Sequence, residues 1–136
     1  MKDFFVCLTE YLLNHQELQA VVSGRVYPHL LPQNPALPSI VYTPISASYG
    51  NGLQRQTGFV RQRVQFSVHN TTFGKARETG RVLKAALQDF SGDMYGINIQ
   101  ATHILSDLST DGNTMTNYKT EEFTNILEFQ FEYMEE

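Results

Sequence analysis

The stretch that decides the fold is Leu127-Glu128-Phe129-Gln130-Phe131-Glu132-Tyr133. Large apolar residues alternate with polar ones along it. This period of two is typical of a β-strand with one buried side and one solvent-facing side. Phe123 and Thr124 extend the alternation towards the N-terminus, and the whole segment is the strongest strand signal in the chain.

A second strand of the same kind precedes it. Val60, Val64, Phe66 and Val68 fall on one side of an alternating run whose other side is polar. Gln62 lies on the apolar side and is the exception. Two strands with one wet face each predict a sheet that is covered on a single face.

A helix is expected between these strands, because apolar or small residues recur there at spacings of three and four. Thr71 or Thr72 can cap its N-terminus, and Ser91-Gly92 can end it. Small Ala76 and Gly80 would let the helix lie close to the sheet. The expected buried seam is Phe73, Ala76, Gly80, Leu83, Leu87 and Phe90.

The flanking segments complete the pattern. One amphipathic helix is predicted from Lys2 to Val22, ending at Ser23-Gly24. A short edge strand from Arg25 to Tyr27 and a strand from Ser39 to Ser46 follow, with Pro44 marking a bulge or a strand edge. After the second helix, a strand is predicted in which Ile97, Ile99, Ala101 and Leu105 share one side.

Two polar segments without periodicity, Tyr49–Gly58 and Ser106–Tyr118, are predicted to be long loops that order against other proteins during assembly. The residues in them that are candidates for such contacts are Tyr49, Gly50, Asn51, Gly52, Leu53, Gln54, Arg55, Asp107, Asp111, Asn113 and Met115.

Together these segments predict one α+β domain spanning residues 1–136, with the order α-β-β-β-α-β-β. We expect a mostly antiparallel sheet of about four to five strands, with two helices packed on one face. Several of the strands are longer than the usual five or six residues and should project beyond the helices.

Composition excludes several classes of protein. The formal net charge of −4 argues against binding to nucleic acid through bulk positive charge. Cys7 is the single cysteine, so no disulfide can form within the chain, and its apolar surroundings indicate a buried thiol. The N-terminus lacks the features of a signal peptide, and no stretch approaches the ~20 apolar residues of a membrane span.

The residues that carry catalysis or metal binding show no usable pattern. The four histidines, His15, His29, His69 and His103, are dispersed and none lies at a metal-ligand spacing from another. Asp107 and Asp111 resemble the start of a calcium loop, but its twelfth position holds Tyr118 where a glutamate is needed. We therefore expect no catalytic residue, no metal and no cofactor.

Charge is unevenly distributed along the chain. Arg77, Arg81 and Lys84 form a basic stripe on the predicted second helix, whereas Glu128 and Glu132 make the C-terminal strand acidic. Three interpretations stay open: a solvated face, a contact in which basic and acidic patches of neighbouring subunits meet, and nucleic-acid binding. The stripe has no interleaved aromatic residues for base stacking, which disfavours the last.

Three stretches in this order resemble the tail-completion, or tail-to-head joining, family of long-tailed bacteriophages. The first is Gly24-Arg25-Val26-Tyr27-Pro28 with Leu31-Pro32-Gln33 and Leu37-Pro38-Ser39-Ile40-Val41-Tyr42. The second is Val64-Gln65-Phe66-Ser67-Val68 with the helix that ends in Val82-Leu83-Lys84-Ala85-Ala86-Leu87. The third is the terminal aromatic strand.

The resemblance implies a non-enzymatic structural protein of the virion. Such a subunit would form a ring, expected to be a hexamer, on the end of the tail tube and would join that tube to the head-tail connector protein. DNA would only pass through the lumen of the ring. The protein would act in the cytoplasm of the host bacterium during assembly and then reside at the head-tail junction.

One alternative from another class is a small α+β ligand-binding or regulatory domain. Tyr27, Tyr42, Phe90 and Tyr95 could line a pocket between its helices and sheet, although they are equally expected as core residues. A hydrolase would have only scattered serines and histidines to act with.

Overall fold

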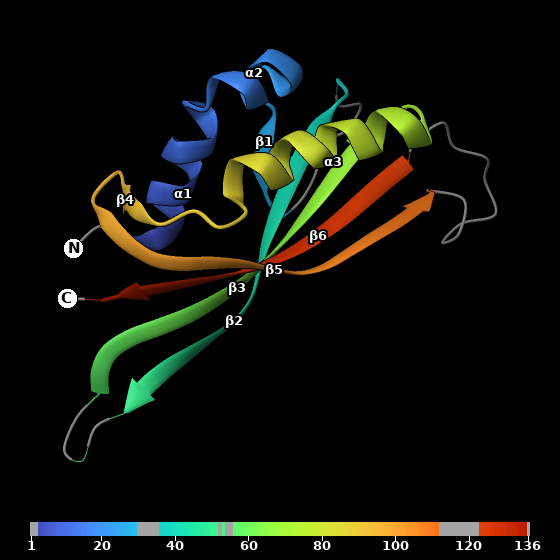
Figure 1. Ribbon diagram of the computed structural model, residues 1–136. Helices are drawn as coiled ribbons and strands as arrows, with labels where there is room; N and C mark the ends of the chain where they lie inside the picture. The colour runs from blue at the N-terminus through green and yellow to red at the C-terminus, as the bar shows by residue number, and fades with distance from the viewer. Residues whose placement is uncertain (1–2, 30–35, 52, 54–55, 112–122, 136) are drawn as a thin grey trace.

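The computed structural model describes residues 3–29, 36–51, 53, 56–111 and 123–135. Its elements in chain order are α1 (Phe4–Leu13), α2 (Gln16–Val22), β1 (Val26–Pro28), β2 (Ser39–Asn51), β3 (Gln56–Asn70), α3 (Phe73–Leu87), β4 (Gly92–Met94), β5 (Ile97–Asp111) and β6 (Phe123–Met134). The strands form one curled six-stranded sheet in the order β1-β2-β3-β6-β5-β4, and the helices lie on one face of it (Figure 1).

The predicted α+β class with a mostly antiparallel sheet is confirmed. The described residues contain more elements than expected, with three helices where two were predicted and six strands where four to five were predicted. β1 is an edge strand, as expected, and its pairing with β2 is the one parallel pairing in the described sheet.

The centre of the sheet is the antiparallel pair β3–β6. Its register runs from Phe59 opposite Met134 to Asn70 opposite Phe123 without a shift. Phe66, Phe129 and Phe131 are completely buried on the helical side of this pair, as their alternation predicts. Each such ring stabilises the fold by about 1.5–3 kcal/mol through removal of apolar surface from water.

The strands next to this centre contain bulges. β2 shifts register between Pro44 and Ser46, which confirms the bulge or edge expected at Pro44. The buried Gln62 donates from Nε2 to the carbonyl of Ser46 at 3.0 Å and to that of Arg63 at 3.1 Å. The polar exception of β3 therefore ties the two strands together at the bulge.

The prediction for the side chains of β5 was wrong beyond Ile99. A register shift between Ile99 and Ala101 adds one residue, and each added residue moves the following side chains to the other face. Thr102 is therefore buried where Ala101 was expected. A second shift, between Ile104 and Ser106, leaves Leu105 exposed.

The single helix predicted from Lys2 to Val22 was also wrong, because the chain forms two helices. Side-chain amides satisfy carbonyls at the end of α1: Asn14 donates to Glu10 and Gln19 to Leu12, both at 2.8 Å. His15 then starts α2, its Nδ1 accepting from the Leu18 N–H at 3.3 Å. The end at Ser23-Gly24 is confirmed, since both residues adopt positive φ.

Helix α3 begins as predicted, with the Thr72 hydroxyl accepting from the Lys75 N–H at 3.1 Å. Ala76, Gly80, Leu83 and Leu87 are buried as the seam requires. The prediction was wrong at both ends of the seam. Phe73 is 57% exposed, and the helix stops at Leu87, before Phe90. The chain then forms the unpredicted β4, joined to β5 by the turn Tyr95-Gly96, in which both residues have positive φ.

Helix α1 is anchored to the central strands by aromatic rings. Phe4 stacks on Tyr133, with their ring centroids 5.0 Å apart, and meets Phe131 at 5.1 Å. Burial, with smaller contributions from Glu135, Tyr49 and Asp3, raises the pKa of Tyr133 to about 12. Burial, helped by Tyr95, also raises the pKa of Tyr11, whose hydroxyl donates to the Ala86 carbonyl at 2.5 Å.

Replacement of Gly80 by alanine should destabilise the protein. A Cβ at this position would overlap the side-chain amide of Asn125 on β6. Either α3 moves off the sheet or the Asn125 amide moves away from its bonds to Asp107 and Leu108, at a cost of about 1–3 kcal/mol. Gly74→Ala in the same helix is the matched control: its Cβ would meet nothing within 4 Å, and it should stabilise by up to about 1 kcal/mol. Equal unfolding midpoints in urea for the two variants would contradict this packing.

Tyr133 should make stability fall at high pH. Its folded pKa is raised from an unfolded value near 10 to about 12, so between these values only the unfolded chain loses the proton. The stability of the wild type relative to Tyr133→Phe should therefore be constant below pH 10 and decline as the pH rises towards 12. Urea unfolding of both proteins across this range measures the difference, and parallel curves would contradict the assignment.

Candidate assembly surfaces

An arm made of two strands extends beyond the helices (Figure 1). It is the outer end of the β2–β3 pair, in which residues 46–51 of β2 pair with residues 56–63 of β3. The β2 side chains from Ile45 to Tyr49 are all exposed, on both faces of the sheet. The arm therefore offers surface that packing within the subunit does not use.

The boundaries predicted for the first loop, Tyr49–Gly58, were wrong. Tyr49, Gly50 and Asn51 belong to β2, and β3 already begins at Gln56. Strands can pair through their backbones without alternating apolar side chains. These polar strand ends therefore could not be predicted from side-chain alternation. Leu53 is fully exposed at the tip of the arm, whereas Gly52, Gln54 and Arg55 lie outside the described residues.

The second predicted loop, Ser106–Tyr118, was wrong in the same way. β5 continues to Asp111, and its residues from Ser106 onward pair with Phe123–Glu128 of β6. Asp107 and Asp111 are therefore strand residues, and Asn113 and Met115 lie outside the described residues. A role for either segment in assembly stays a prediction.

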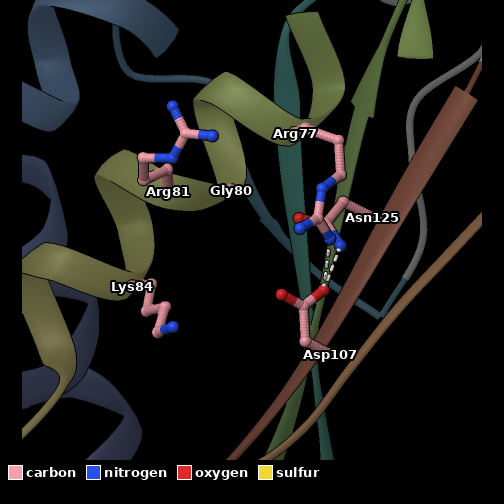
Figure 2. A pocket seen from close by; sticks show the side chains of 6 residues that line it. All are labelled: Arg77, Gly80, Arg81, Lys84, Asp107 and Asn125. Atoms are coloured by element: carbon pink, nitrogen blue, oxygen red, sulfur yellow. Dashed lines mark hydrogen bonds and ion pairs between the residues drawn. The ribbon is translucent and has the colours of Figure 1, made fainter. Parts of the chain in front are cut away.

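The basic stripe of Arg77, Arg81 and Lys84 lies on α3 around a small hollow of about 60 Å³ (Figure 2). Arg77 Nη1 bonds to Asp107 Oδ1 at 2.8 Å and approaches Ser109 Oγ at 3.3 Å. The buried Asn125 amide donates to the same Asp107 oxygen at 2.7 Å and to the Leu108 carbonyl at 3.1 Å. Asp107 therefore links α3, β5 and β6.

The other two cations of the stripe are differently placed. Arg81 pairs with Glu78 on its own helix at 2.8 Å, and both side chains are mostly exposed. Lys84 lines the hollow. An exposed pair of this kind contributes little to stability. Arg81, whose side chain is 70% exposed, stays accessible to another molecule.

Glu128 and Glu132 lie on the bare face, which is the face of the sheet opposite the helices. They alternate along β6 with the buried Leu127, Phe129 and Phe131. Glu128 is paired with Arg63, whose Nε donates to Oε2 at 3.1 Å. Glu132 lies 3.0 Å from His103 Nε2. Each carboxylate therefore has a partner within its own subunit, on the face away from the basic stripe.

The aromatic residues proposed for a ligand pocket are distributed among separate contacts. The Tyr42 hydroxyl lies 3.0 Å from the Thr9 hydroxyl, beside a shallow groove lined by Phe5, Val6 and Glu10. Phe90 packs on Tyr11, with centroids 4.9 Å apart.

The described part of the chain holds no group of three or more histidine, cysteine or acidic side chains placed to share a metal ion. Nor does any helix in it combine the length and the apolar character that crossing a bilayer requires.

The chain is similar to known proteins in sequence and in fold. Residues 7–117 match the family described as "Tail completion protein gp17". No curated protein sequence matches the chain. A chain in the solved structure "Virion of native gene transfer agent (GTA) particle" superposes with a TM-score of 0.76 at 14% identity, over 96% of this chain and 94% of that one. At 14% identity, the similarity to the gene transfer agent chain shows a shared fold alone.

Removal of the Asp107 carboxylate should destabilise the protein more than removal of an exposed one. Asp107→Ala leaves Arg77 unpaired and takes a strong acceptor from the buried Asn125 amide, which should cost about 1–2 kcal/mol. Glu78→Ala, which breaks only the exposed pair with Arg81, should cost no more than about 0.5 kcal/mol. Urea unfolding compares the two, and equal losses would contradict a linking role for Asp107.

Proposed function

The chain belongs to the tail completion protein gp17 family, a family of structural proteins, and we propose that it caps the finished tail tube of a phage-like particle as a ring. In this proposal the ring is a hexamer, stops growth of the tube, and joins it to the connector protein of the head. DNA is the one further partner, and it passes through the lumen.

The observation that carries the proposal is the one-sided architecture of the subunit. All described helices lie on one face of the sheet, and the arm reaches beyond them (Figure 1). A tail-completion protein needs contacts to its own copies, to the tube and to the connector, and projecting strands supply surface for such contacts. The solved relative in fold comes from the virion of a gene transfer agent particle, which supports placement in a comparable particle.

The charges on the bare face support passage of DNA. Arg63 and His103 lie next to Glu128 and Glu132 on this face. Because DNA adheres to proteins mainly through unneutralised cations, a lumen lined by such matched groups would hold DNA weakly.

Deletion of the gene from the genome that encodes the particle tests this function. We expect full heads and separate tails to accumulate, because nothing ends the tube or joins it to the connector. Electron microscopy of the lysate measures the joined fraction, and supplying the wild-type gene in trans should restore it. Joined particles at the normal frequency without the gene would exclude the role.

A further inference from the structure

We propose that the free edge of β2 in one copy pairs with the free edge of β5 in the next copy, so that the sheets of the ring form one closed antiparallel barrel. This inference rests on the proposed ring and specifies its interface. The edges concerned are Thr43–Asn51 and His103–Asp111, two segments of equal length.

Both segments lack a strand neighbour on their outer side among the described residues. β1 pairs with β2 only up to Tyr42, where the His29 N–H donates to the Tyr42 carbonyl at 2.9 Å. β4 pairs with β5 only up to Ile99, and the last bond on that side in the described chain joins the Asp89 N–H to the Thr102 carbonyl at 3.2 Å. Backbone groups on an open edge readily pair with another strand.

The topology gives the two edges the correct direction. β2, β3, β6 and β5 are each antiparallel to the next, so the two outer long strands run in opposite directions. Rotation about a ring axis keeps these directions. The β5 edge of one copy therefore meets the β2 edge of the next copy as an antiparallel partner, and repetition of this heterologous contact closes a ring.

The chemistry of the edges also fits a second copy. No charged residue occurs from Thr43 to Asn51, although monomeric proteins commonly protect open edges with charges. Each edge has an exposed aliphatic residue at its bulge, Ile45 on β2 and Leu105 on β5. Asp107 on the β5 edge is already neutralised by Arg77 and would not repel the incoming strand.

Closure in this manner fixes which face is inside. A sheet with helices on one side is thicker on that side, and the thicker layer fits where the circumference is larger. The helices would therefore lie outside, and the bare face with its matched charges would line the lumen.

Cysteine cross-linking tests the pairing. The native Cys7 is the single cysteine and is completely buried. A thiol reagent should therefore react with the introduced cysteines and not with Cys7. Ser48 and Ser106 are exposed and lie opposite Arg61 and Glu128, hence on the bare face of β2 and of β5. With rings assembled, Ser48→Cys/Ser106→Cys treated with a short bifunctional thiol reagent should give a ladder of covalent oligomers up to the full ring.

The single variants are the controls for direction. Each should stay monomeric on a denaturing gel, because neither edge meets a copy of itself. Covalent dimers from either single variant would show a two-fold contact and overturn the proposal. Rings without any ladder in the double variant would place the interface elsewhere and leave the proposed function standing. If no rings form either in solution or on tail tubes, both the proposed ring and the proposed interface are refuted.

A charge placed on the edge supplies an independent test. Ile45→Lys should weaken ring formation by about tenfold or more, which corresponds to at least about 1.4 kcal/mol, while the unfolding midpoint of the subunit stays near that of the wild type. Leu13→Lys on α1 is the matched control, because Leu13 and Ile45 are 41% and 43% exposed, and it should leave ring formation unchanged. Mass photometry measures both, and equal effects would contradict the edge contact.

Discussion

The uninterrupted pairing of β3 with β6 is the constraint on which the rest of the structure depends. Its register has no shift from Phe59 to Asn70, so the buried apolar side chains of both strands stay on one face over the full length. That continuous face receives α1 through Phe4 and α3 through the close approach of Gly80 to Asn125. The bulges occur in the pairings on either side, β2–β3 and β5–β6, where the sheet changes from a packed core to projecting surface.

Sequence patterns predicted this regular part well and the irregular part poorly. The alternation in β6, the cap at Thr72 and the bulge at Pro44 each depend on local chemistry, and all three are confirmed. The side chains of β5 beyond Ile99 could not be placed, because one added residue inverts the pattern and nothing in the sequence marks it. Polar strand ends were taken for loops, since their order comes from a paired backbone and not from their side chains.

The candidate surfaces show a similar division. The sequence located the cations of α3 and placed the acidic residues of β6 on the solvent-facing side of their strand, but it could not say which side chains they would contact. The structure places them on opposite faces of the sheet and gives Glu128 and Glu132 partners from β3 and β5 that are distant in sequence. Contacts of this kind follow from strand register, which composition does not encode. Asp107 is the clearest case, because its link between Arg77 and Asn125 had no sequence signal.

The uncharged edge of β2 has a consequence for the cell that makes this protein. Before assembly, an edge of this kind can recruit any extended chain, including misdirected copies of itself, and head-to-tail contacts that fail to close grow into filaments. Under the proposed function, production of the subunit should be matched to the supply of growing tails, since surplus copies would have no tail end on which to close a ring. Selection would then act on dosage and timing of synthesis as strongly as on the stability of the fold.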